Sequence, residues 1–162
     1  MRKRGNSSRR SNCFETKRLQ NKFKINQKRT GKTFWRGRLQ VVKQKPLVIL
    51  DSAHNPDGWD KLFESIKIFN FEKMFVVFGT MNDKETEKAK KHLKKANLVF
   101  LTKSDSFRAE EPKNLLKKIG FGKIVLPEKK ALKEAISAAG KKDLVLVTGS
   151  IYLVGKAHKF FN

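Results

Sequence analysis

The sequence contains very little cysteine and histidine. Cys13 is the single cysteine, so the chain can form no internal disulfide and no cluster of thiolates that could hold a metal. The three histidines are too far apart in the sequence for the spacing of a metal site, and we expect His92 and His158 to be surface or half-buried helix residues. The scarcity of cysteine fits a cytoplasmic protein.

Several motifs are also absent. The chain has no glycine-rich phosphate loop of the Walker type, no Gly-x-Gly-x-x-Gly after a strand, and no Gly-x-Ser-x-Gly nucleophile elbow. The first ten residues lack the apolar stretch of a secretory signal, and the longest apolar runs are only as long as a strand. The sequence therefore predicts no membrane span, no Ser-His-acid triad and no phosphate loop of its own.

Acidic residues are scarce in the first third of the chain. Residues 1–45 contain 16 Lys and Arg but only one acid, Glu15, whereas residues 46–162 contain 22 Lys and Arg and 14 acids. We expect residues 1–32 to be a basic, solvated, disordered leader. Such a leader would also bind nucleic acid non-specifically and in a salt-dependent way, and its composition resembles that of an organelle transit peptide.

From Pro46 onward, short apolar runs alternate with amphipathic stretches. The expected strands are Leu47–Leu50, Met74–Phe78, Leu98–Leu101, Lys123–Leu126 and Leu144–Val147, with Arg38–Val42 as a further edge strand. Continuous Val, Ile and Leu runs are typical of parallel strands that are covered on both faces. Because crossovers are right-handed, the pattern predicts an α/β fold with a doubly wound, mostly parallel, Rossmann-like sheet of five or six strands.

The segment Leu47–Pro56 is the most informative part of the sequence. A buried strand ends in Asp51 and His54, and Pro56 indicates that a helix begins there. Since ligands of open α/β sheets bind beyond the carboxyl ends of the strands, both side chains are candidates for a binding site. The alternative is an ordinary turn, in which Asp51 is a turn acid and Asn55 caps the helix.

The loops after the other strands are polar as well. They contain Thr80 and Asp83, then Ser104, Asp105 and Arg108, and finally Thr148 and Ser150. The segment Thr148-Gly149-Ser150 has the form of an anion-binding loop at the start of a helix. The simpler interpretation, which we favour slightly, is that Ser150 caps that helix.

Four ordered segments resemble the C-terminal domain of the folylpolyglutamate synthase/dihydrofolate synthase family of the Mur ligase superfamily. They are Phe34-Trp35-Arg36-Gly37-Arg38-Leu39, Leu50-Asp51-Ser52-Ala53-His54-Asn55-Pro56, Val77-Phe78-Gly79-Thr80-Met81-Asn82-Asp83-Lys84, and the closing run from Leu144 to Gly155. Two residues depart from the family pattern: Arg36 replaces a proline, and Ser52 replaces a glycine. Serine tolerates fewer backbone conformations than glycine, so Ser52 is expected to tighten its loop.

The resemblance implies a chemistry and a set of roles. Members of the family join L-glutamate to a folate or dihydropteroate carboxylate with ATP and Mg²⁺, through an acyl phosphate. By resemblance, Arg38 and Asp51 contact ATP, and His54 and Ser150 line the catalytic cleft near the incoming amino acid. Arg108 would suit a substrate carboxylate as a bidentate partner. No residue of this chain is expected to bind the metal.

The resemblance begins at about Thr33, and the ATPase domain that precedes it in the family is too large for residues 1–32. We therefore expect a leader at 1–32, a glutamate ligase domain at 33–162, and a fragment that is inactive without a separately encoded ATPase domain. Two alternatives stay open at this point: a basic nucleic-acid-associated α/β protein, and an inactive remnant of the ligase.

Overall fold

The computed structural model describes residues 37–162. The expected disorder of residues 1–32, the domain boundary at residue 33 and the motif residues Phe34 to Arg36 lie outside this range. Residues 37–66 and 71–162 form one compact unit. No helix among the described residues has both the length and the apolar character needed to cross a membrane.

The sheet has six strands in the order β1-β2-β6-β3-β4-β5. All neighbouring pairs are parallel except β1 and β2, which are antiparallel. This confirms the predicted doubly wound, mostly parallel fold. The strands are β1 (Gln40–Gln44), β2 (Leu47–Leu50), β3 (Met74–Phe78), β4 (Leu98–Leu101), β5 (Lys123–Ile124) and β6 (Leu144–Thr148).

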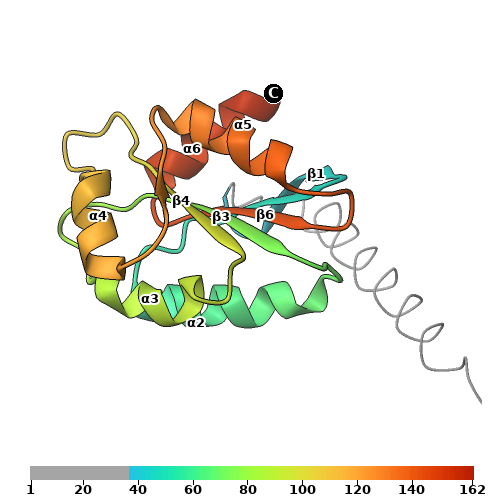
Figure 1. Ribbon diagram of the computed structural model, residues 1–162, viewed down its shortest axis with the longest axis horizontal. Coiled ribbons are helices and arrows are strands. Elements are labelled where there is room, and N and C mark those ends of the chain that lie inside the picture. Colours follow the sequence, from blue (N-terminus) through green and yellow to red (C-terminus); the bar gives the residue numbers. More distant parts are fainter. Residues whose placement is uncertain (1–36) are drawn as a thin grey trace, which may run out of the picture. The chain divides into compact units, whose positions relative to one another are not determined.

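Helices cover both faces of the sheet (Figure 1): α2 and α3 lie on one face, and α5 and α6 lie on the other. The α-helices are α2 (Pro56–Ser65), α3 (Lys90–Leu93), α4 (Pro112–Ile119), α5 (Glu128–Ala138) and α6 (Ile151–Phe161), and the 3₁₀ helices are η1 (Ile66–Ile68) and η2 (Thr86–Ala89). Every residue of β3 and β6 is buried, as expected for strands in the middle of a sheet that is covered on both faces.

Two strands differ from the sequence prediction. The edge strand begins at Gln40 rather than Arg38, because Gly37 and Leu39 adopt positive φ angles of 79° and 42° that no strand contains. The strand β5 has two residues instead of the four expected, although the amide of Val125 still donates to the carbonyl of Leu101 at 3.0 Å. A short edge strand presents few unpaired backbone groups to solvent.

The expected exposure of His92 is wrong. Its side chain is buried between α2 and α3, where it stacks on Phe63 with ring centroids 4.8 Å apart. Its Nε2 lies 2.7 Å from a carboxylate oxygen of Asp60 on α2. Burial lowers the pKa of His92, against the opposing effect of Asp60. A polar partner within reach allows the imidazole to be buried, and the sequence contained no local signal for that partner.

Candidate functional site

The loop between β2 and α2 is set by a helix cap. The side-chain Oδ1 of Asn55 accepts a hydrogen bond from the amide of Gly58 at 2.8 Å, and Pro56 occupies the first turn of α2. A proline loses nothing in that position because the first amides of a helix have no partner within it. The predicted cap at Asn55 is confirmed, and it fixes where α2 leaves the sheet.

Asp51 holds two segments of backbone together. Its two carboxylate oxygens accept hydrogen bonds from the amides of Leu39 and Ala53, each at 2.8 Å. Burial raises the pKa of Asp51 above its usual value of 3.8, although the two amides and the nearby charge of Arg38 act in the opposite direction. Asp51 is thus the turn acid of the alternative interpretation, and its remaining lone pairs are available to a ligand.

The carbonyl oxygen of Ala53 joins the β2–α2 loop to the loop after β6. It accepts from the indole Nε1 of Trp59 at 3.1 Å, from the hydroxyl of Thr148 at 3.3 Å and from the amide of Gly149 at 3.0 Å. Gly149 has a φ of 109°, and a Cβ there would lie 2.7 Å from the carbonyl oxygen of Gly79. Three donors on one oxygen fix the two loops relative to each other.

Arg38, Asp51 and His54 line one cleft, whose volume is about 470 Å³. One face of α2 supplies further polar lining along its length, from Asp57, Lys61 and Ser65. Lys61 was not predicted from the sequence, but it stands four residues after Asp57, a spacing that places both on one face of a helix. The cleft therefore combines two cationic and two carboxylate side chains.

His54 is exposed at the cleft, and its ring orientation is defined by one contact. Its Nδ1 lies 2.9 Å from the carbonyl oxygen of Ser52. Because a carbonyl can only accept, Nδ1 carries the proton, and Nε2 of the neutral ring can accept one.

Ser52, which replaces a glycine of the family pattern, needs no left-handed backbone. Leu39 is the one non-glycine residue with positive φ among residues 37–162.

Ser150 does not line this cleft. Its side chain is buried, and its hydroxyl oxygen accepts from the amide of Leu153 at 3.2 Å, which makes Ser150 the N-cap of α6. The simpler interpretation of the segment Thr148-Gly149-Ser150 is therefore the one observed. Whether Ser150 also acts in catalysis stays a prediction.

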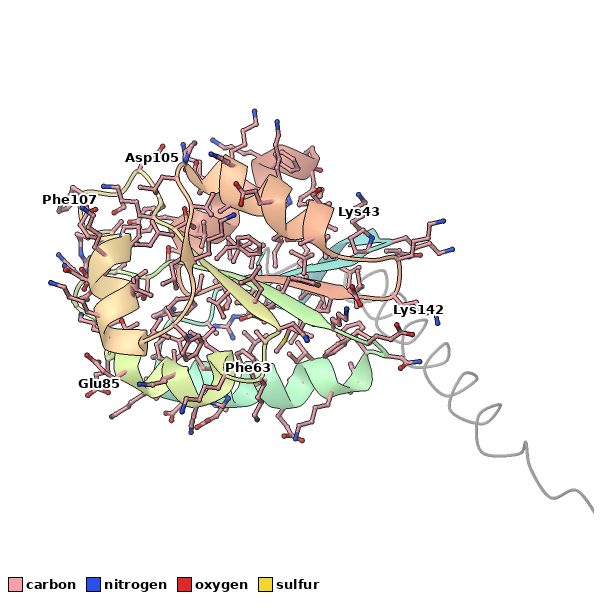
Figure 2. The ribbon with its side chains drawn as sticks, viewed as in Figure 1. Lys43, Phe63, Glu85, Asp105, Phe107 and Lys142 are labelled. Carbon is pink, nitrogen blue, oxygen red and sulfur yellow. The ribbon has the colours of Figure 1, made fainter. Side chains whose placement is uncertain are left out.

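Arg108 also lies outside the cleft. Its Nη2 is 2.8 Å from a carboxylate oxygen of Asp83, and both side chains are about half exposed. The adjacent Phe107 is 95% exposed, and Figure 2 shows it in the loop between β4 and α4. Arg108 was expected to bind a substrate carboxylate. In the structure it pairs instead with the carboxylate of Asp83 from this chain.

The cleft occupies the position where ligands bind in folds of this kind. The strands β2 and β6 are neighbours, and the helices that follow them, α2 and α6, lie on opposite faces of the sheet (Figure 1). Such a switch in direction opens a crevice at the carboxyl ends of the strands. The cleft around Asp51 lies on the β2 side of this point and has no lining residue from the loop after β6. The charges of Arg38 and Lys61 suit phosphate oxygens, whereas no three His, Cys, Asp or Glu side chains among residues 37–162 are grouped to hold a metal.

An open, doubly wound sheet with a charged cleft at the carboxyl end of β2 is typical of an α/β ligand-binding domain. A family model described as the Mur ligase, glutamate ligase domain matches residues 37–151, and the chain belongs to this family. The match confirms the resemblance that the four sequence motifs indicated.

Curated relatives include folylpolyglutamate synthases and UDP-N-acetylmuramoyl peptide ligases. The chain is 32% identical over 128 residues to a probable bifunctional folylpolyglutamate synthase/dihydropteroate synthase of Halobacterium salinarum, covering 76% of the chain and 16% of that protein. It is 33% identical over 132 residues to the dihydrofolate synthase/folylpolyglutamate synthase of Bacillus subtilis, covering 79% and 31%. It is 37% identical over 123 residues to a UDP-N-acetylmuramoyl-L-alanyl-D-glutamate–2,6-diaminopimelate ligase of Prochlorococcus marinus, covering 67% and 23%.

Solved structures of folate ligases have the same fold. E. coli FolC in complex with DHPP and ADP matches with a TM-score of 0.74 and 27% identity, over 80% of this chain and 32% of that one. A bifunctional folylpolyglutamate synthase/dihydrofolate synthase with Mn, AMPPNP and L-glutamate bound matches with a TM-score of 0.72 and 26% identity, over 76% and 31%. The chain thus spans about a third or less of each protein it resembles.

Proposed function

We propose that residues 37–162 act as the glutamate ligase domain of an ATP-dependent folate– or dihydropteroate–glutamate ligase in the cytoplasm. The observation that carries this proposal is the cleft that brings Arg38, Asp51 and His54 together at the carboxyl end of β2. The folate ligases among the relatives and the ADP-bound FolC structure support it.

Arg38 and Asp51 are proposed to bind the nucleotide. The guanidinium of Arg38 would pair with phosphate oxygens, and Lys61 would add a second positive charge from α2. The carboxylate of Asp51 would accept from ribose or adenine donors with the lone pairs that the amides of Leu39 and Ala53 leave unused. Because those amides hold Asp51 in place, it would meet the nucleotide without reorganisation.

His54 is proposed as the catalytic base. The α-ammonium of glutamate must lose a proton before its nitrogen can attack the acyl phosphate carbon and expel phosphate. The unprotonated Nε2 of His54 can take that proton, since Nδ1 is held by the carbonyl of Ser52. Ser150 would act as a positioning residue through the cap of α6. Arg108 would bind a substrate carboxylate only by releasing Asp83.

Catalysis would require an ATPase domain, supplied as a separate chain if this chain lacks one. When bound in the assembled ligase, Mg²⁺ offsets the charge of the phosphates during transfer. The cleft of this chain contributes cations and a base, and a phosphate loop must come from the ATPase domain. We therefore expect weak nucleotide binding and no ligation by the 162-residue chain alone. Binding of nucleic acid through residues 1–32 stays a separate prediction.

Nucleotide titration of the full chain tests the nucleotide site. ATP should shift the backbone amide resonances of the β2–α2 loop, and Arg38→Ala should weaken binding at least tenfold. Lys94→Ala, an exposed lysine just after α3, is the matched control and should bind ATP as the parent does. Shifts confined to other loops, or equal losses in both variants, would refute the nucleotide site.

Turnover in a mixture with the ATPase domain of the B. subtilis relative tests the substrate class. Phosphate release should require dihydropteroate or tetrahydrofolate together with glutamate. His54→Gln should lower kcat more than it raises KM. Turnover with a UDP-muramoyl peptide and diaminopimelate instead, using the matching cell-wall ATPase domain, would assign the chain to the other branch of its relatives.

A further inference from the structure

A second cavity lies between α5 and α6, on the face of the sheet opposite α2 (Figure 1). Its volume is about 250 Å³, and it shares no lining residue with the cleft around Asp51. Its apolar lining comes from β3, β6 and the two helices, through Val77, Val147, Leu132, Leu153, Ala157 and Phe160. The roles proposed above for the nucleotide, the amino acid and the folate make no use of this space.

Charged side chains surround the apolar lining. Lys129 and Glu128 come from α5, and Lys156 and Lys159 come from α6. Lys156 is bound to Asp105, whose side-chain hydrogen bond raises the pKa of Lys156, and Glu128 adds to that effect. No ion pair among residues 37–162 includes Lys129 or Lys159. Lys159 feels the charge of Asp105 only at longer range, so two exposed cations that form no direct ion pair with the described residues border an apolar interior.

The start of α5 adds to the positive potential at this cavity. Glu128 and Lys129 form its first turn and line the cavity, and no side chain caps that turn, because the N-cap position is Pro127. The first amides of a helix have no partner within it and attract anions. The eleven residues of α5 are enough for this effect, and it acts at the same place as the charge of Lys129.

The volume limits the size of a ligand. A cavity of about 150 Å³ accommodates benzene, which corresponds to about 25 Å³ for each non-hydrogen atom. A space of about 250 Å³ therefore holds about ten such atoms. A whole nucleotide or a folate exceeds this size, and inorganic phosphate has no apolar body to fill the interior.

We propose that the cavity between α5 and α6 binds a small amphipathic carboxylate of about ten non-hydrogen atoms, with its apolar chain against Leu132 and Leu153. Its carboxylate lies between Lys129 and Lys159 at the first turn of α5. Octanoate has ten non-hydrogen atoms and is the probe of choice. The site is independent of the proposed ligase function and of the cleft around Asp51.

Calorimetric titration of the full chain with octanoate, together with amide chemical shifts, tests the site. The shifts should map to α5 and α6. Hexanoate, which is shorter by two methylene groups, should bind about fifteenfold more weakly, because each buried methylene contributes about fourfold. Dodecanoate should gain nothing over octanoate, because the cavity is already full. 1-Octanol, which carries no charge, should bind at least tenfold more weakly.

Variants separate the cavity from non-specific adsorption. The double variant Lys129→Met, Lys159→Met should weaken octanoate binding at least tenfold, whereas the matched control Lys94→Met, Lys95→Met should leave it unchanged. Ala157→Phe should abolish binding by filling the cavity, and Ala157→Leu serves if the larger side chain prevents folding. Absence of binding at millimolar octanoate, equal affinity for octanol, or equal losses in both lysine pairs would overturn the proposal.

Discussion

The two loops that follow β2 and β4 leave the same edge of the sheet but are held in different ways. The β2–α2 loop is held by buried contacts in which backbone groups take part, around Asp51 and the carbonyl of Ala53. The β4–α4 loop is also anchored by backbone hydrogen bonds near its ends, where the amide of Thr102 donates to the carbonyl of Phe78 and that of Glu110 to the carbonyl of Thr80, each at 2.9 Å. Its middle part instead exposes Phe107 and carries the solvated ion pairs of Arg108 with Asp83 and of Lys156 with Asp105. Buried hydrogen bonds resist salt, whereas exposed ion pairs are screened by it. The first loop is thus suited to holding a fixed site, whereas the side chains in the middle of the second loop make mainly solvated contacts.

Among the substitutions that test this difference, removal of the Asp51 carboxylate should lower the free energy of unfolding most. Asp51→Ala leaves the amides of Leu39 and Ala53 without acceptors, and we expect the free energy of unfolding to fall by about 3 kcal/mol. Urea unfolding of the full chain measures this loss. Asp83→Ala in the other region is the control and should cost less than about 0.5 kcal/mol. Similar losses for both would remove the distinction between the loops.

The second prediction concerns the hydrogen bond from the indole of Trp59 to the carbonyl of Ala53. Trp59→Phe removes one of the three donors to the carbonyl of Ala53 and part of a fully buried ring, and it should cost about 2 kcal/mol. Phe107→Ala should change stability by less than about 0.5 kcal/mol, because that ring is almost fully exposed. A larger cost at Phe107 would mean that its ring packs against the body of the domain.

The carboxylates of the two loops should titrate in opposite directions. Burial raises the pKa of Asp51 above 3.8, so its contribution to stability is complete below that pH and is lost as the pH rises through the raised pKa. The hydrogen bond from Lys156 lowers the pKa of Asp105, so its contribution is present above pH 3.8 and is lost as the pH falls through the lowered pKa. Carboxyl NMR titration measures both midpoints. Midpoints on the same side of 3.8 would contradict this assignment.

The smallest expected effect concerns Arg108. Arg108→Ala removes an exposed ion pair and should lower stability by less than about 0.5 kcal/mol. Any loss should vanish in 0.5 M NaCl, since the Debye length is then a few ångströms. Urea unfolding at low and high salt measures it. A loss that persists at high salt would place Arg108 among the buried, salt-resistant contacts.

The sequence predicted the features that depend on local pattern. The runs Met74–Phe78 and Leu144–Val147 are buried central strands, as their continuous apolar character indicated, and Asn55 with Pro56 began the next helix as expected. The four motifs indicated the family correctly because they combine residue type, spacing and order, whereas the alternation of apolar runs with amphipathic stretches indicated only the α/β class.

The features that the sequence did not predict depend on contacts between distant segments. His92 is buried because Asp60, 32 residues earlier, supplies its partner. The start of β1 is set by the turn at Gly37 and Leu39 and by Asp51, which accepts from the amide of Leu39 twelve residues before it. Lys61 reaches the cleft only because α2 leaves the sheet at the angle that its cap fixes. The residues that surround a position in the sequence do not indicate which distant residue will contact it.

The position of the Ala53 carbonyl in the main chain affects how well the domain tolerates amino-acid substitutions at the junction of its two loops. The acceptor belongs to the main chain, so a substitution at position 53 that keeps the backbone path leaves the oxygen in place. One of its three donors, the amide of Gly149, is also main-chain. Only Trp59 and Thr148 offer side chains whose loss removes a donor, and each loss leaves two donors behind. The junction of the two loops is therefore redundant in its side-chain donors, and single substitutions of Trp59 or Thr148 should weaken it step by step rather than abolish it.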